Sequence, residues 1–414
     1  MSNIVVQKFG GTSLADTDRF KAVAQIIKET SKKGKKVVAV VSAMAGETQR
    51  LIDLAKEVQE IPDPREYDAL ISSGEQVSVA LLAMSLRNEK VNSKSYTAFQ
   101  LGLRTDDYHG KARISSIDTK NLLEDISSNI IPVITGFQGI NEEGDITTLG
   151  RGGSDTSAVA LAVALKAEEC QIFTDVDGVY TTDPNIYSKA KKIEKLTFEE
   201  MLELSSLGAK VLQIRSVEFA SKYNMPIRVK SSFTNDKGTL INAEENMEDA
   251  LISGVTYTSD DAKLTIRKVP DIPGIAAKIL DPISSKGIEV DVIIQNVSED
   301  KTTDFTFTVK REKSLEAKKI LSNLSEEFGG GEIELNEDIS KVSLVGVGMK
   351  SHAGVAATMF KTLAEKNINI EMISTSEIKI SVVVKESFAK EAVKSLHDAS
   401  VSYTHLTLPT SLIV

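Results

Sequence analysis

The sequence of 414 residues contains no tryptophan, a single cysteine and few aromatic side chains, which make up 5% of the chain. One cysteine, Cys170, excludes a disulfide within the chain and a zinc site built from cysteines. Scarce cysteine is typical of proteins of the reducing cytoplasm, where we expect this one. Cys170 begins an apolar run, so we predict that it lies in the core.

Membrane-spanning and nucleic-acid-binding signals are also missing. There is no uninterrupted run of 18 apolar residues, and the first residues enter a strand pattern rather than a signal peptide. Acidic residues outnumber basic ones by 59 to 49, so the formal net charge is −10. Without a basic stripe, neither nucleic acid nor a membrane is an expected partner. The length predicts a globular protein of two or three domains.

In the N-terminal half, short apolar runs alternate with amphipathic helical patterns. A longer helical stretch is predicted over residues 65–87. Such an alternation favours a mainly parallel sheet covered by helices on both faces, a three-layer αβα arrangement. The strand patterns cover residues 4–9, 37–41, 130–137, 171–174 and 227–229.

Residues 147–157, TTLGRGGSDTS, place Arg151 among three glycines directly before an apolar helix. The unpaired N–H groups of a helix start form an anion site, and a guanidinium suits bidentate binding of a carboxylate or phosphate. The alternative is an ordinary helix start that is capped by Ser154 or Asp155.

Lys8 lies at the end of the first strand pattern, immediately before Gly10 and Gly11. A lysine beside a glycine loop is a point charge for phosphate oxygens, and the glycines let the backbone approach them. The spacing is not that of the GxxxxGK[ST] loop. The alternative is a strand-end lysine that faces solvent.

A third constellation spans residues 172–184. Thr174 and Asp175 end a strand pattern, where α/β sheets place ligand-binding groups. Asp183 precedes proline in a turn signal, and a turn is a sufficient explanation for it. Tyr180 either lies against a nucleotide base or packs within the domain.

The C-terminal half repeats itself at an offset of 80 residues, with Gly274-Ile-Ala-Ala matching Gly354-Val-Ala-Ala. Each copy has the ferredoxin-like βαββαβ order. The polar residues 233–250 that precede the repeats have the composition of a linker.

Five ordered motifs and the repeat carry a resemblance to a known family. The motifs are KFGGTS at 8–13, SAM at 42–44, SSGE at 72–75, TTLGRGGSD at 147–155 and FTDVDGVYTTDP at 173–184. Together they resemble the motifs of the aspartate kinases, a branch of the amino acid kinase family, and the repeat resembles the paired ACT regulatory domains of these enzymes. The resemblance covers residues 3–398.

The resemblance implies a domain arrangement: a catalytic domain over 1–232, a linker over 233–250, and ACT domains over 251–338 and 339–399. A strand around 252–258 is expected to complete the second ACT domain. Residues 400–414 resemble nothing in the family, and we interpret them as a non-native tail, with a terminal strand as the alternative. In some relatives a separate regulatory subunit starts near Met247, which would give an α2β2 assembly.

The implied reaction transfers the γ-phosphoryl of ATP, with Mg²⁺, to the side-chain carboxylate of L-aspartate, giving 4-phospho-L-aspartate for lysine, threonine and methionine synthesis. Lys8 would contact the transferred phosphoryl, Arg151 the substrate α-carboxylate and Glu75 its ammonium group. Asp155 would fix Lys8 or the ammonium. We assign no residue as a metal ligand. Ser42, Thr48 and Ser154 would bind substrate, and Phe9, Gly10, Gly11, Ser13, Thr174, Asp175, Tyr180, Asp183 and Lys210 would bind the nucleotide.

The repeats imply regulation by lysine and threonine acting jointly, at sites where ACT domains pair between subunits of a homo-oligomer. In each copy a glycine turn opens a helix beside a polar strand end; helix capping alone is the alternative. The second copy departs from the family at Ala353, where proline is usual. The expected effector contacts are Asp271, Gly274, Ala276, Gln295, Asn296, Ser374, Thr375 and Ser376.

Two other functions fit parts of the sequence. One is another amino acid kinase, acting on glutamate, acetylglutamate or UMP; the tandem repeat and the motif at 72–75 argue against it. The other is a non-catalytic amino-acid sensor, which the presence of Lys8, Arg151 and Asp155 argues against.

Overall fold

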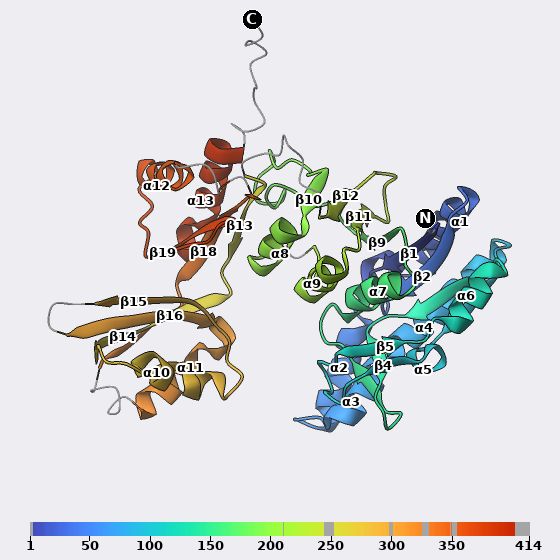
Figure 1. Ribbon diagram of the computed structural model, residues 1–414, viewed down its shortest axis with the longest axis horizontal. Coiled ribbons are helices and arrows are strands. Elements are labelled where there is room, and N and C mark those ends of the chain that lie inside the picture. The colour runs from blue at the N-terminus through green and yellow to red at the C-terminus, as the bar shows by residue number, and fades with distance from the viewer. Residues whose placement is uncertain are drawn as a thin grey trace, which may run out of the picture. The chain divides into compact units, whose positions relative to one another are not determined.

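The computed structural model describes residues 3–209, 211–243, 252–297, 301–324, 331–347, 349 and 354–401. The chain divides into two compact units, Met1–Tyr180 with Lys191–Glu248, and Thr181–Ala190 with Asp249–Val414. Figure 1 shows the elements of both. Each unit is described by itself.

The first unit is built on an eight-stranded sheet of order β10-β12-β11-β9-β1-β2-β6-β3. Every neighbouring pair is parallel except β11 and β12. This confirms the predicted, mainly parallel α/β fold. The strands are β1 (Ile4–Phe9), β2 (Lys36–Val41), β3 (Ser93–Tyr96), β6 (Ile131–Thr135), β9 (Glu169–Thr174), β10 (Lys195–Thr197), β11 (Ile227–Ser231) and β12 (Thr239–Asn242).

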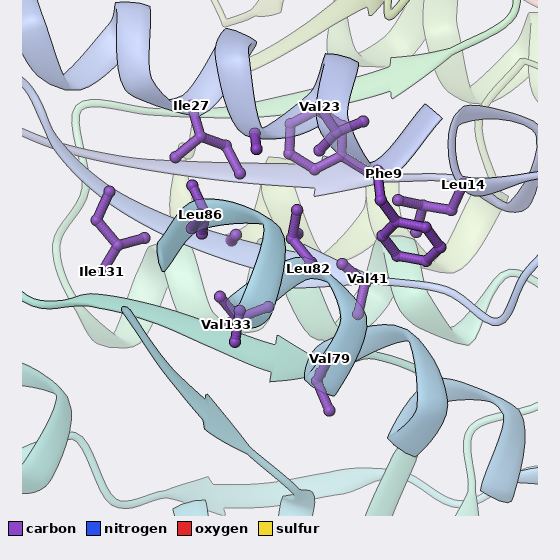
Figure 2. Close-up of a cluster of buried hydrophobic side chains, with 14 of the residues drawn as sticks. Phe9, Leu14, Val23, Ile27, Val41, Val79, Leu82, Leu86, Ile131 and Val133 are labelled. Atoms are coloured by element: carbon purple, nitrogen blue, oxygen red, sulfur yellow. The ribbon is translucent and has the colours of Figure 1, made fainter. Parts of the chain in front are cut away.

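Helices α1 (Thr17–Lys32) and α4 (Ser73–Asn88) cover one face of this sheet, and their apolar residues form a buried core with β1, β2 and β6 (Figure 2). Burial of each large side chain there contributes roughly 1.5–3 kcal/mol. Helix α7 (Gly153–Ala164) packs against β1, β2 and β9. The other helices of this unit are α2 (Glu47–Val58), α3 (Pro64–Ile71), α5 (Ala98–Leu101), α6 (Lys120–Ser127), α8 (Phe198–Ser206) and α9 (Ile214–Tyr223).

The two faces of β1 contact different parts of the unit. Side chains alternate between the faces of a strand, so Phe9 and Lys8 point in opposite directions. Phe9 is fully buried in the core shared with α1 and α4, stacked on Phe173 with ring centroids 4.8 Å apart. Lys8 therefore points to the face on which α7 packs.

Two parts of the first unit differ from the sequence prediction. The helical stretch predicted over 65–87 is two helices, α3 and α4, which meet at Ser72. Together they are long and apolar enough to cross a membrane by length and composition, but α4 packs on α1 and the sheet, as a core helix does. The predicted linker contains β12, in which the buried Thr239 and Ile241 alternate with the half-buried Leu240 and Asn242.

A smaller four-stranded sheet supports the glycine-rich loop before α7. Its order is β5-β4-β7-β8, with β7 and β8 forming a hairpin. The last strand ends three residues before Arg151, so this sheet fixes the start of the loop. The strands are β4 (Leu103–Thr105), β5 (Ile114–Ile117), β7 (Gln138–Ile140) and β8 (Ile146–Thr148).

The second unit contains the two repeats, each a four-stranded antiparallel sheet with two helices, as predicted. The first has order β15-β16-β14-β17 and helices α10 (Ile275–Ser284) and α11 (Ser314–Asn323). The second has order β13-β18-β20-β19 and helices α12 (Val355–Glu365) and α13 (Ala389–Leu396). The strands are β13 (Gly254–Thr258), β14 (Asp261–Pro270), β15 (Val290–Val297), β16 (Thr302–Lys310), β17 (Ile333–Asn336), β18 (Ile339–Val345), β19 (Met372–Thr375) and β20 (Lys379–Lys385).

Strand β13 precedes the first repeat in the sequence but pairs with β18 of the second. It supplies the fourth strand of the second sheet. The segment Thr181–Ala190 also belongs to this unit. The carbonyl of Thr181 accepts a hydrogen bond from the Val255 amide at 2.7 Å, and Ile186 packs on the core of the second repeat.

Candidate active site

Lys8 and Asp155 form the centre of the candidate site. Lys8 lies near the carboxyl end of β1 and Asp155 in the first turn of α7, and Lys8 Nζ is 2.6 Å from Asp155 Oδ1. Their side chains are only 12% and 10% exposed. The pair forms because β1 and α7 pack together, which brings the first and fourth motifs into contact. Asp155 thus holds the ammonium group of Lys8 in place.

Gly10 and Gly11, which follow β1, leave the space beside Lys8 free of side chains. A Cβ on Gly10 would lie 3.5 Å from Lys8 Nζ, and one on Gly11 would lie 3.0 Å from the Ala43 carbonyl oxygen. The backbone can therefore approach a ligand closely. Ser13 is buried and accepts a hydrogen bond from the hydroxyl of Ser232 at 2.8 Å, so it joins two strand ends.

Glu75 lies in the first turn of α4 and is nearly buried. Its Oε1 accepts a hydrogen bond from the Ala43 amide at 2.9 Å, whereas Oε2 has no hydrogen-bond partner among the described residues. Burial raises the pKa of Glu75 to about 7, although the Ala43 amide and the charge of Lys8 act in the opposite direction. A buried acceptor without a donor is costly, so this oxygen suits a cationic ligand.

Arg151 lies on an exposed loop between two glycines in the left-handed conformation, Gly150 at φ +80° and Gly152 at φ +72°. Among the residues that the structure describes, Arg151 makes no ion pair. Glycine is required at position 152 both because of this positive φ and because a Cβ there would lie 1.7 Å from Cγ of Gln213. The guanidinium is therefore free for a ligand.

The remaining predicted substrate residues lie on nearby elements. Ser42 follows β2, and its amide donates to the carbonyl of Phe9. Thr48 lies in the first turn of α2, and Ser154 in the first turn of α7. The side chain of Ser154 is pressed against Gly136, where a Cβ would lie 2.6 Å from Ser154 Cβ.

The predicted nucleotide residues are only partly brought together. Thr174 ends β9 and its hydroxyl donates to Asp175 Oδ1 at 3.0 Å. Tyr180 donates to Asp177 Oδ1 at 2.8 Å, and this bond, with burial, raises the pKa of Tyr180 to about 12. Asp183 belongs to the second unit, where its carboxylate accepts from the Asn185 amide and forms a turn.

Two further nucleotide predictions concern Lys210 and Phe9. Lys210 lies outside the described residues. The Phe9 ring is fully buried in the core on the face opposite Lys8, which favours packing over ligand contact. Cys170 is free and buried, as predicted, and burial raises the pKa of its thiol.

The predicted effector residues cluster within each repeat. In the first, Gln295 Nε2 donates to Asp271 Oδ1 at 3.4 Å, near the start of α10, where Gly274 adopts φ +90°. Ala276 lies in the first turn of that helix. The side chain of Asn296 and Ala353 fall outside the described residues. In the second repeat, Ser374 and Thr375 lie in β19 and Ser376 begins the turn to β20.

The described residues contain no group of three His, Cys, Asp or Glu side chains that could hold a metal ion by themselves. The carboxylates beside the glycine loop are Asp155 and Glu75. One or two carboxylates fit Mg²⁺ that is bound mainly by phosphate oxygens and water, which is the usual arrangement in phosphoryl-transfer enzymes.

Sequence reasoning missed several residues that shape this site. Gly136 makes room for Ser154, and Gln213 fills the space beside Gly152. The neighbouring Phe137 has φ +69°, an uncommon conformation for a bulky residue, and its amide donates to Ser157 Oγ. A glycine near the end of the buried strand pattern over 130–137 was the available signal for Gly136; the other contacts link residues far apart in the sequence.

Comparison with known proteins identifies the family. Residues 3–231 match the amino acid kinase family, and residues 264–327 and 342–399 each match an ACT domain. The aspartate kinase of Stutzerimonas stutzeri is 56% identical over 96% of this chain and 97% of its own length.

Solved structures give the same result. Escherichia coli aspartokinase III in complex with aspartate and ADP, its R-state, has a TM-score of 0.80 at 28% identity, covering 96% of this chain and 99% of that one. The T-state of that enzyme, in complex with lysine and aspartate, has a TM-score of 0.75 at 27% identity, covering 96% and 100%. The chain therefore belongs to the amino acid kinase family and, within it, to the aspartate kinases with two ACT domains.

Proposed function

We propose that this protein transfers the γ-phosphoryl group of ATP to the side-chain carboxylate of L-aspartate. The observation that carries the proposal is the Lys8–Asp155 pair beside Gly10 and Gly11, at the carboxyl end of a parallel strand. Ligands of α/β sheets bind at this edge. The E. coli relative, which is similar over nearly the whole chain, binds aspartate and ADP.

The chemistry explains why a lysine is needed. The acceptor carboxylate is already an anion at neutral pH, so no general base has to create the nucleophile. The difficulty is repulsion: two unit charges ~4 Å apart at an effective dielectric constant of ~20 repel by roughly 4 kcal/mol. Lys8 screens this repulsion, and Asp155 keeps its ammonium group on the transferred phosphoryl.

The substrate is held at the two charged groups of its α-carbon. Arg151 binds the α-carboxylate with its planar guanidinium, and Glu75 accepts the α-ammonium group on its unpartnered Oε2. Ser42, Thr48 and Ser154 orient the reacting end. Fixing both groups of the α-carbon places the side-chain carboxylate for in-line attack on the γ-phosphorus, with loss of ADP.

The nucleotide lies along the ends of β1 and β9. Gly10 and Gly11 contact its phosphates, and Thr174, Asp175 and Tyr180 its nucleoside. Asp183, Lys210 and the buried Ser13 stay predictions from the family. Asp155 or Glu75 would lie near Mg²⁺ bound to the phosphates, which would supply neutralisation of their charge. The protein side chains bind and orient; no step requires a proton to move.

The two ACT domains make the enzyme a target of end-product control. We propose that lysine binds in this half, because the T-state relative binds lysine, and that threonine acts with it. In the first repeat, the paired Gln295 and Asp271 suit an ammonium group, and the start of α10 suits a carboxylate. Pairing of ACT domains between subunits, and a separately started subunit at Met247, stay predictions.

The test is a steady-state assay of ADP release with Arg151→Ala. Loss of a bidentate charge-assisted pair should raise the KM for aspartate by about 10- to 100-fold, with the KM for ATP unchanged. Unchanged kinetics would contradict the role of Arg151. Activity of the wild type with glutamate or acetylglutamate in place of aspartate would favour another kinase, and threonine or lysine binding without ADP release would favour a sensor.

A further inference from the structure

Asp68, on α3, is completely buried, yet its carboxylate accepts four hydrogen bonds. Oδ1 accepts from the hydroxyl of Thr148 at 2.7 Å. Oδ2 accepts from the amides of Thr148 and Gly110, both at 2.9 Å, and lies 3.0 Å from Nδ1 of His109. A buried carboxylate is tolerated only with such partners, so this connection is specific and strong.

The donors come from the two segments that flank the arginine loop. Thr148 is the last residue of β8, three positions before Arg151. Gly110 lies in a turn that touches the loop itself: a Cβ on Gly150 would lie 2.9 Å from the Gly110 carbonyl oxygen. Asp68 therefore ties the strand that leads into the loop to the turn against which the loop rests.

Arg215, on α9, grips the same two segments. Its Nη1 donates to the carbonyl of Leu149 at 2.5 Å and its Nη2 to the carbonyl of Ala112 at 2.9 Å. One acidic and one basic side chain, from two helices, thus hold the loop where it begins.

We infer that Asp68 is a positioning residue for Arg151, supported by Arg215. The glycines at 150 and 152 give the loop its left-handed turns but also make it intrinsically flexible. An arginine on such a loop binds a carboxylate well only if the loop is held in place before binding, because otherwise binding must order it. The inference rests on the proposed role of Arg151 in aspartate binding.

The test compares Asp68→Ala with Asp68→Asn. Alanine removes all four acceptor contacts, and we expect the KM for aspartate to rise at least about tenfold with the KM for ATP unchanged. Asparagine can keep its amide oxygen on the three donors at Oδ2 and turn its NH₂ toward the Thr148 hydroxyl, which can accept. We therefore expect Asp68→Asn to restore most of the affinity.

If Asp68→Ala does not fold, Thr148→Val decides, because it removes only the hydroxyl contact with Oδ1. It should raise the KM for aspartate by about fivefold, the effect of one hydrogen bond. The matched control is Ser93→Ala. Ser93 is also buried and donates to the Ala83 carbonyl at 2.9 Å, on a different side of the domain. This variant should lower Tm without changing the KM for aspartate.

A double variant separates positioning from general damage. If Asp68 acts through Arg151, Asp68→Ala should add nothing to the KM for aspartate in an Arg151→Ala background. An equal additional rise there, or an unchanged KM in the single variant, overturns the inference. If Arg151→Ala itself leaves the KM unchanged, the proposed role of Arg151 fails instead.

Discussion

Two lysines of this protein are nearly buried beside aspartates, one in each unit, and their surroundings differ. Lys8 has Asp155 as its one ion-pair partner among the described residues, with glycines on one side and the unpartnered Oε2 of Glu75 nearby. Lys341, on β18, is 6% exposed and lies between Asp261, on β14, and Asp291, on β15. Lys8 therefore pairs with one carboxylate and can also bind an anionic ligand, whereas Lys341 already pairs with two carboxylates of the protein.

The cluster around Lys341 is balanced by the protein itself. Asp261 also binds Lys310, at 2.8 Å, so two lysines face two aspartates and the sheets of the two repeats are joined. Burial opposes the charge of Lys341, but Asp261 and Asp291 outweigh it and hold its pKa above the usual value. The contrast teaches that a buried ion pair does not by itself indicate a functional site; at Lys8 the adjoining glycine loop makes the difference.

The sharpest way to test the contrast is Lys8→Ala. Removing the charge that faces the transferred phosphoryl should lower kcat about 10³-fold, the loss seen when a preorganised donor is removed. The aspartate KM should change little. The measurement is the kinetics of ADP release, with circular dichroism to show that the fold is kept; near-normal kcat in a folded variant would refute the assignment.

Lys341→Met should lower stability and leave catalysis nearly unchanged. It removes one of the two lysines that pair with the buried Asp261 and leaves only Lys310, so the regulatory half should lose about 2 kcal/mol in its free energy of unfolding. Urea titration measures this loss, and kcat without effector should stay close to normal. Lys341→Met combined with Asp261→Asn removes both charges and should recover much of the stability; no recovery would mean that packing, not charge, is responsible.

A smaller effect is expected from Glu75. Its pKa of about 7 means that the free enzyme is largely protonated there at pH 6 and largely ionised at pH 8. Only the carboxylate binds the substrate ammonium, so the KM for aspartate should fall about tenfold from pH 6 to pH 8. The proton also favours the folded state, so this contribution to stability is lost as pH rises through 7.

Glu75→Gln is the matched control, because it keeps the size and the acceptor oxygen without the titration. Its KM for aspartate should be higher and should not vary between pH 6 and pH 8. A pH dependence that persists in this variant would assign the titration to another group.

The sequence predicted those parts of the site that lie next to one another along the chain. Lys8 with its glycines and Arg151 with its helix start each carry a local pattern. Lys8 lies near the end of a strand of the large parallel sheet, and Arg151 follows β8 of the smaller sheet. The pairing of Lys8 with Asp155 was one of two options that the family suggested, and only the packing of α7 on β1 favours it.

Other features left no local pattern. Asp68 and Thr148 are 80 positions apart, and neither residue type indicates that the two side chains form a hydrogen bond. Strand β12 is only four residues long and lies in a polar stretch, so composition outweighed its weak alternation. Strand β13 joins the sheet of the more distant repeat. Periodicity cannot show this because it reports the face of a strand and not its neighbour, so only the family resemblance predicted it.

The transfer of Thr181–Ala190 to the second unit has a practical consequence for dissecting the enzyme. A gene shortened after residue 232 would encode Ile186 without the apolar partners that cover it, and Thr181 without the strand amide that its carbonyl binds. The shortened protein would expose the segment Thr181–Ala190, including the apolar side chain of Ile186, to solvent. Separating the catalytic from the regulatory unit therefore requires redesign of the segment Thr181–Ala190 in addition to an earlier stop codon.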